Sequence, residues 1–250
     1  MRFFISLSYN GSPFCGWQSQ PGVTSVQGEL KRALSIAFGE TVEVTGAGRT
    51  DAGVNARYYV AHFDLTAGEI KEPNQTVRKI NAILPKEICV FGIFSVPDGA
   101  HARYDAVSRT YRYYLHTAKD PFARFSYLYT YTLDVEAMNR AAARLVGTHD
   151  FTSLEKTGSD NGTSLCHVTT ARWERIDATH LVFTVTANRF LRNMVRAMVG
   201  TLLEIGRGRH PEEWIDEVLA ARDRCSAGQS VPGEALFLEE IAYPYPLQTI

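Results

Sequence analysis

The chain has 250 residues, of which 45% are hydrophobic and 21% are charged, and its formal net charge is -1. This balance is typical of a globular protein with one large or two smaller domains. A near-neutral charge gives no global support for nucleic-acid binding, so any anionic partner has to meet a local basic patch. No run approaches the roughly 18 apolar residues of a membrane span, and we expect a soluble, cytoplasmic protein without membrane contact.

Several common motifs are excluded by spacing. The four cysteines, Cys15, Cys89, Cys166 and Cys225, lie far apart and form no CxxC pair. This argues against a zinc site, a redox motif and a disulfide framework. The glycines at 46, 48 and 53 lack dinucleotide-loop spacing, and no GxxxxGK[ST] phosphate loop occurs. Residues 158–162 lack the spacing of a GxSxG nucleophile turn and are typical of a flexible loop.

The first half of the chain predicts the element order β-α-β-β-α-β. Alternating apolar residues indicate strands over 3–9, 41–45, 59–65 and 88–96. Apolar residues spaced by four predict a helix from Val26 to Phe38, for which Thr24 and Gln27 resemble a capping box. A second helix over 77–84 is ended by Pro85.

The second half repeats this order, with one extra helix near its end. Strands are predicted over 108–116, 168–176, 181–187 and 236–243, and helices over 135–145, 190–205 and 214–219. Gly147 is a candidate cap after the helix at 135–145. Two successive units predict an α+β protein with two ferredoxin-like halves, whose mostly antiparallel sheets flank a central cleft. We expect the halves to cover 1–103 and 104–250.

The loop Gly48-Arg49-Thr50-Asp51-Ala52-Gly53 separates two predicted strands. Glycines allow another molecule to approach the backbone closely, so Asp51 is placed to meet a substrate. Its carboxylate can act as a nucleophile, a general base or a metal ligand. The metal role is the weakest because no second acid lies nearby at metal-ligand spacing. A polar turn in which Asp51 bonds its own backbone is the structural alternative.

Arginines and tyrosines form two further candidate surfaces. Arg189, Arg192 and Arg196 step by three and four along the helix predicted from Asn188, so they would share one face. That face is either solvated surface or a basic strip for phosphates. In residues 109–114, aromatic residues are interleaved with arginines, which suits base stacking and phosphate contact, or a core strand. Tyr113 fits the core, whereas Tyr111 fits either reading.

Seven stretches occur in an order that resembles the tRNA pseudouridine synthase A family over nearly the whole chain. They are 9–11 with 14–18, 48–54 with the strand 60–63, 81–85, 101–104, 109–113, 147–151 and 190–196. Two positions depart from the family pattern. Asn55 stands where the family usually has His, and the stretch 232–236 differs from the usual Pro-x-Gly-Leu.

The resemblance implies an isomerase that converts uridine to pseudouridine at positions 38, 39 and 40 of the tRNA anticodon stem-loop. The glycosidic C1′–N1 bond breaks, the uracil turns, and C5 bonds to C1′. Because no group is gained and no electron is transferred, the resemblance implies no metal and no cofactor. Family members are homodimers that bind tRNA, so a homodimer is expected.

The resemblance also implies roles for individual residues. Asp51 would be the nucleophile, Tyr111 would stack on the target uracil, and Arg196 would pair with Asp51 to keep it ionised. Arg49 would support the loop or fill the space of the displaced base. A lower-ranked group would contact tRNA, namely Arg109, Arg189 and Arg192.

Two other functions are compatible with parts of the sequence. One is a catalytically silent RNA-binding module, against which the presence of Asp51 and Arg196 argues. The other is an Asp-nucleophile hydrolase, against which the missing second acid and metal cluster argue. Whether Asp51 attacks C1′, attacks C6 or removes the 2′ proton stays open, because the same residues suit all three.

Overall fold

A computed structural model describes residues 1–66, 68–158 and 162–247, which form two compact units. Unit 1 contains Met1–Val107 and Leu238–Ile250, and unit 2 contains Ser108–Phe237. Residues 159–161 of the segment predicted to be a flexible loop lie outside the described residues. No helix in the described part of the chain is long and apolar enough to cross a membrane.

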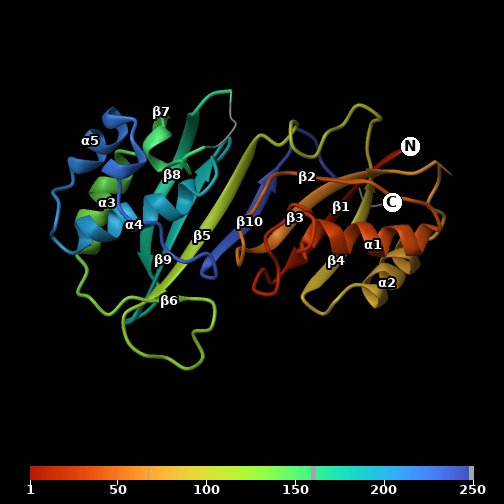
Figure 1. The fold of residues 1–250 in the computed structure, drawn as a ribbon, viewed down its shortest axis with the longest axis horizontal. Helices are drawn as coiled ribbons and strands as arrows, with labels where there is room; N and C mark the ends of the chain where they lie inside the picture. The colour runs from red at the N-terminus through yellow and green to blue at the C-terminus, as the bar shows by residue number, and fades with distance from the viewer. Residues whose placement is uncertain (67, 159–161, 248–250) are drawn as a thin grey trace. The chain divides into compact units, whose positions relative to one another are not determined.

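Unit 1 is an antiparallel sheet with two helices. Its elements are β1 (Arg2–Tyr9), α1 (Val26–Phe38), β2 (Val44–Gly46), β3 (Asn55–Asp64), α2 (Pro73–Ile83) and β4 (Ile88–Ser95). The strand order is β4-β1-β3, with β2 paired to β3. Helices α1 and α2 contact each other and the strands β2 and β4, respectively (Figure 1). The element order is the one that the sequence predicts.

Local chemistry moves several boundaries in unit 1. The cap of α1 is Ser25, whose hydroxyl accepts a hydrogen bond from the Gly28 N–H, so the predicted capping box at Thr24 is wrong by one residue. The side-chain amide of Gln27 instead donates to the Val44 carbonyl, which ties α1 to β2. Helix α2 begins at Pro73, which suits the first turn because proline lacks an N–H.

The core of unit 1 lies between the helices and the sheet. Leu30 and Leu34 of α1 are fully buried, as are Ile5 and Leu7 of β1. Phe4, on the alternate side of β1, is also buried and meets the ring edge of Tyr243. Burial on both faces explains why β1 has consecutive apolar residues from Phe3 to Ile5 rather than a strict alternation.

The strands of unit 2 pair antiparallel, apart from one parallel pair. Its elements are β5 (Ser108–His116), β6 (Tyr127–Leu128), α3 (Val135–Ala143), β7 (Gly147–Asp150), β8 (Leu165–Arg175), β9 (His180–Ala187), α4 (Met194–Gly206) and α5 (Trp214–Ala221). The strand order is β5-β9-β8-β7, and β6 pairs in parallel with β5. Two 3₁₀ turns cover Thr152–Leu154 and Arg224–Ser226. The last strand, β10 (Leu236–Ala242), begins in unit 2 and continues into unit 1.

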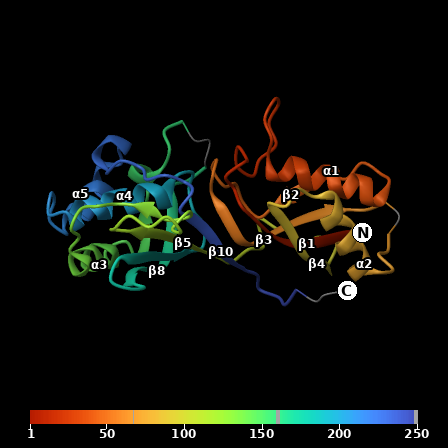
Figure 2. The same ribbon diagram turned by 90° about the horizontal axis from the view of Figure 1, so that it is seen from below.

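Helix α4 is more deeply buried than α3 and α5. Almost all of its residues are buried, and it contacts α3 (Figure 2). The segment that follows α5 crosses it at Gly200, where a Cβ atom would lie 1.7 Å from the Gln229 carbonyl oxygen. The Thr201 hydroxyl accepts the Gly228 N–H at 3.0 Å and fixes the same crossing. Glycine at 200 is therefore required by the close approach of this segment.

Two predictions for unit 2 are wrong in detail. Gly147 does not cap α3, because the helix ends at Ala143 with Arg144 as its cap, and Gly147 begins β7. Helix α4 begins at Met194 rather than near Phe190, because Asn193 before it has a φ of 66°. Asn tolerates this left-handed conformation better than most residues, and a helix cannot continue through it.

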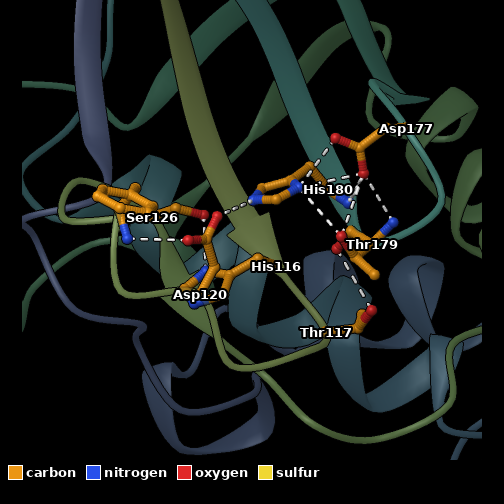
Figure 3. Close-up of polar contacts among 8 residues, drawn as sticks. His116, Thr117, Asp120, Ser126, Asp177, Thr179 and His180 are labelled. Atoms are coloured by element: carbon orange, nitrogen blue, oxygen red, sulfur yellow. Dashed lines mark hydrogen bonds and ion pairs between the residues drawn. The ribbon is translucent and has the colours of Figure 1, made fainter.

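A polar cluster joins the loop after β5 to the turn between β8 and β9 (Figure 3). His180 lies between two carboxylates, with Nε2 3.5 Å from Asp120 and Nδ1 3.0 Å from Asp177. The His116 ring stacks on His180, and its Nδ1 lies 3.0 Å from the Ser126 hydroxyl. These contacts hold the loop at the end of the β5–β9 pair, within unit 2.

Candidate active site

Asp51 lies on the tight loop between β2 and β3. Its side chain is half-buried, whereas its neighbour Ala52 is exposed. The Val54 N–H donates to the Asp51 carbonyl oxygen at 3.2 Å, which closes the turn. The carboxylate is therefore held by a folded turn at the edge of the solvent, where a substrate can reach it.

An aromatic cluster lies beneath this loop. Trp17 and Tyr59 stack with ring centroids 4.1 Å apart, and Tyr9 meets Tyr59 edge-on at 5.6 Å. All three rings are buried. The Tyr59 hydroxyl donates to the Gly48 carbonyl oxygen, which fixes the first residue of the loop. The loop thus rests on a base of buried aromatic rings.

The segment after β1 forms one wall of the loop. The Trp17 N–H donates to the Thr50 carbonyl oxygen at 3.2 Å, and the Gly53 N–H donates to the Phe14 carbonyl oxygen at 3.4 Å. These two bonds hold the loop on both sides of Asp51. Two segments about 35 positions apart in the sequence thus provide hydrogen-bond partners for each other's backbone groups.

Arg49 is exposed, and its Nε–H donates to the Gln18 Oε1 at 3.3 Å. Gln18 in turn donates to the Gln27 side chain at 2.8 Å, which links the contact to α1. The Arg49 guanidinium therefore braces the loop against the same neighbouring segment.

In unit 2, Tyr111 and Arg109 lie on β5 two positions apart, so both side chains point to one face of the strand. Tyr111 is half-buried, and its ring meets the Phe190 ring edge-on at 5.1 Å. The Arg109 Nη1 donates to the Asn188 carbonyl oxygen at 2.8 Å. Strand β5 and the segment before α4 are thereby joined at the residues that carry the candidate roles.

Tyr113 has the core position that the sequence indicates. It is fully buried, and its hydroxyl donates to the Pro232 carbonyl oxygen at 3.1 Å. Burial raises the pKa of this phenol, so it stays protonated at physiological pH.

Arg196 lies on the first turn of α4 and is half-buried. Its Nε–H donates to the Val231 carbonyl oxygen at 2.7 Å, on the segment that crosses α4 at Gly200. Because this bond fixes the Nε end of the guanidinium, the direction of the whole planar group is set. The segment that crosses α4 therefore also determines where the Arg196 side chain points.

The prediction that Arg189, Arg192 and Arg196 share one helix face is wrong. Arg189 and Arg192 both precede Met194, the first residue of α4, and Asn193 separates them from the helix. The Arg192 carbonyl oxygen accepts the Lys156 N–H at 2.9 Å, and its side chain is exposed. Their surface is a loop surface, whose spacing does not follow the helical period.

His, Cys, Asp and Glu are the side chains that most often bind metal ions in proteins. Across 1–66, 68–158 and 162–247, no group of three or more such side chains could hold a metal ion.

Comparisons with known proteins decide the family. A family model described as tRNA pseudouridine synthase matches residues 141–244. The tRNA pseudouridine synthase A of Parabacteroides distasonis is 49% identical over 247 residues, covering 98% of this chain and 97% of that protein. The protein of the same name from Bacteroides thetaiotaomicron is 48% identical over 246 residues, covering 97% of this chain and 91% of that protein. The chain belongs to the tRNA pseudouridine synthase A family.

Membership in the tRNA pseudouridine synthase A family confirms the resemblance and the expected class of enzyme, an isomerase. Among solved structures, an archaeal box H/ACA sRNP Nop10–Cbf5 complex matches with a TM-score of 0.38 and 12% identity, over 82% of this chain and 44% of that chain.

Sequence reasoning missed the residues that support the loop, chiefly Tyr9, Tyr59 and Asn55. Tyr9 ends an apolar strand directly before Asn-Gly, and that position was the signal available for it. Tyr59 looks like an ordinary strand residue, because its alternation with neighbours only predicts burial. Asn55 stood out solely as a departure from the family pattern, and the structure places it among the most buried polar residues, with 1% exposure.

Proposed function

We propose that the protein isomerises uridine to pseudouridine at positions 38, 39 and 40 of the tRNA anticodon stem-loop, with Asp51 as the nucleophile. The observation that carries the proposal is near-full-length identity of 46–49% to proteins named tRNA pseudouridine synthase A. The half-buried carboxylate on a folded loop supports the choice of Asp51.

The chemistry needs a positioned carboxylate rather than a redox centre. The C1′–N1 bond breaks, the uracil turns, and a C5–C1′ bond forms. The proton that leaves C5 is matched by one that N1 gains, so atoms and electrons balance without a co-reactant. Asp51 can begin this sequence by attacking C1′, by attacking C6 or by removing the 2′ proton.

The substrate uridine has to leave its base stack before C1′ can be reached, which costs a few kcal/mol. In this proposal Tyr111 stacks on the extruded uracil and repays part of that cost. The edge-on contact with Phe190 supports this role, because it fixes the plane of the Tyr111 ring before RNA arrives. Arg49 braces the loop, and its exposure suits contact with the RNA at the vacated position.

Arg196 pairs with Asp51 in this proposal and keeps the carboxylate ionised. The fixed Nε–H bond to Val231 supports the role, because an oriented guanidinium loses less entropy when it binds a carboxylate. Arg109, Arg189 and Arg192 contact tRNA phosphates. The exposed side chain of Arg192 suits this function, and Arg109 also fixes the backbone before α4.

Fold and assembly complete the proposal. Unit 1 supports a ferredoxin-like half, because its β-α-β-β-α-β order forms an antiparallel sheet in which β1 lies between β3 and β4. We take the chain to consist of two such halves, divided near residue 103. The active form is a homodimer in which both subunits contact one tRNA.

The test is turnover of unmodified tRNA by purified protein, with pseudouridine mapped by position. The proposal predicts product at 38, 39 and 40 and none elsewhere in the molecule. Product at other positions would refute the proposed site specificity. Tight binding of the same tRNA without product would instead favour the silent RNA-binding module.

A further inference from the structure

Thr50, the residue before Asp51, is held by one backbone and one side-chain hydrogen bond. Its carbonyl oxygen accepts the Trp17 N–H at 3.2 Å. Its hydroxyl lies 2.9 Å from the Tyr9 hydroxyl, and the two residues are 8% and 4% exposed. Both the backbone and the side chain of Thr50 are thereby fixed. The direction in which the chain enters Asp51 is set by these bonds.

The position of the Tyr9 ring is fixed by strand pairing and by contacts with other aromatic rings. The ring is the last buried residue of β1 and pairs in the sheet with Ala56 at the start of β3. Trp17 and Tyr59 contact it with ring centroids 6.2 Å and 5.6 Å away. The hydrogen bond between the Tyr9 and Thr50 hydroxyls therefore fixes the loop relative to the sheet.

We propose that Tyr9 is a positioning residue for Asp51 and acts through the hydroxyl of Thr50. The inference rests on the proposed role of Asp51 as the nucleophile. A carboxylate that must meet one atom of an extruded uridine tolerates little displacement, since errors near 1 Å cost about 100-fold in rate. Tyr9 therefore sets turnover, and it contributes little to the affinity for tRNA, which is governed by phosphate contacts.

Asn55 provides the matching restraint on the other side of Asp51. Its Oδ1 accepts the Gly11 N–H at 2.9 Å in a fully buried position. Gly11 follows Tyr9 by two residues, so the ends of the loop are tied to one short segment. Two buried side-chain hydrogen bonds, one before and one after Asp51, thus define the loop.

The test is a double-mutant cycle of Tyr9→Phe and Thr50→Val, read by saturating turnover of unmodified tRNA. Each single change removes one hydroxyl and leaves the volume nearly unchanged. We expect each to lower kcat about tenfold, with KM within about twofold of the unmodified protein. The double variant falls no further than the worse single variant, because both changes break the same bond.

Tyr243→Phe is the matched control. It removes a hydroxyl that donates to the Ala102 carbonyl oxygen at 2.6 Å, in unit 1 but outside the loop contacts. Its kcat is expected to equal that of the unmodified protein. A Tyr9→Phe variant with unchanged kcat overturns the proposal, and so do single effects that multiply in the double variant.

Amide hydrogen exchange gives a second readout that does not depend on activity. In Tyr9→Phe, the amides of residues 48–54 exchange faster than in the unmodified protein, whereas in Tyr243→Phe they do not. Unchanged exchange in Tyr9→Phe refutes the anchoring. An unmodified protein that forms no pseudouridine refutes the proposed function, and the exchange data then still decide whether Tyr9 anchors the loop.

Discussion

Gly16 packs directly on the carbonyl oxygen of Thr50, which would lie 2.4 Å from a Cβ atom added to this glycine. Gly16 also has a φ of +84°, which L side chains rarely adopt. We predict that Gly16→Ala lowers the free energy of unfolding by about 2–4 kcal/mol and kcat at least about 100-fold. Chemical denaturation and steady-state turnover measure the two effects.

Gly22→Ala is the matched control for this prediction. Gly22 has a similar φ of +79°, but no atom lies within 4 Å of an added Cβ. It therefore bears only the backbone strain, about 1–2 kcal/mol, and kcat stays unchanged. Equal losses of turnover in the two variants would show that strain, rather than contact with the loop, causes the defect.

His62 makes stability depend on pH. Burial, followed by the positive charge of Arg2, lowers its pKa to about 4 from 6.5. Below pH 6.5 the unfolded chain binds a proton that folded His62 does not take up until about pH 4. The stability that neutral His62 contributes is thus present above pH 6.5. It is lost as the pH falls towards 4, by at most roughly 3 kcal/mol.

His62→Gln tests this dependence. The Nδ1 of His62 accepts the Ala102 N–H at 3.1 Å, and glutamine keeps a side-chain acceptor without titrating. Urea unfolding at pH 4, 5, 6 and 7 is expected to give a flatter curve for the variant. His101, whose pKa is also lowered by burial, is present in both proteins and leaves a common residual slope. Parallel curves would exclude His62 as the source.

Tyr111 is predicted to act through its ring. Tyr111→Phe keeps the ring and its edge-on contact with Phe190, so kcat/KM stays within about threefold. Tyr111→Ala removes a stacking surface worth about 1–3 kcal/mol per base, which corresponds to a loss of about 5- to 150-fold. Steady-state kinetics on unmodified tRNA distinguish the two. An inactive Tyr111→Phe variant would assign the essential role to the hydroxyl.

Arg192 is predicted to contact a phosphate. Arg192→Ala weakens tRNA binding and lowers the slope of log K against log salt by about 0.7–0.9, while saturating kcat stays unchanged. Arg175→Ala, which removes another exposed arginine on β8 that lies outside the predicted set, is the control. Filter binding at several salt concentrations measures both. Identical slopes in the two variants would remove Arg192 from the RNA-binding surface.

The sequence predicts the elements well where one period dominates. Ser108–His116 and Val26–Phe38 have the predicted bounds, because their alternating or four-residue apolar spacing is unbroken. The start of α4 was mispredicted because the apolar pattern continues through Asn193, whereas the helix does not. The spacing of apolar residues does not reveal that a single residue adopts the left-handed conformation.

The candidate site, too, is predictable from the sequence only in part. The glycine-bounded loop marks Asp51 as a candidate, since the acid and the glycines are close together in the chain. The restraints on that loop come from Tyr9 and Asn55, whose partners Thr50 and Gly11 lie about 40 positions away. Such pairs are set by strand register, which a single sequence does not specify.

The most direct test of the account is single-turnover pseudouridine formation by Asp51→Asn, with tRNA affinity measured in parallel. Asparagine has nearly the same shape as aspartate but cannot act as a nucleophile or base at this position. We predict that product formation falls at least about 1,000-fold, while the Kd for tRNA stays within about threefold. Product formation by a folded Asp51→Asn protein at the rate of the unmodified enzyme would contradict the central role of Asp51.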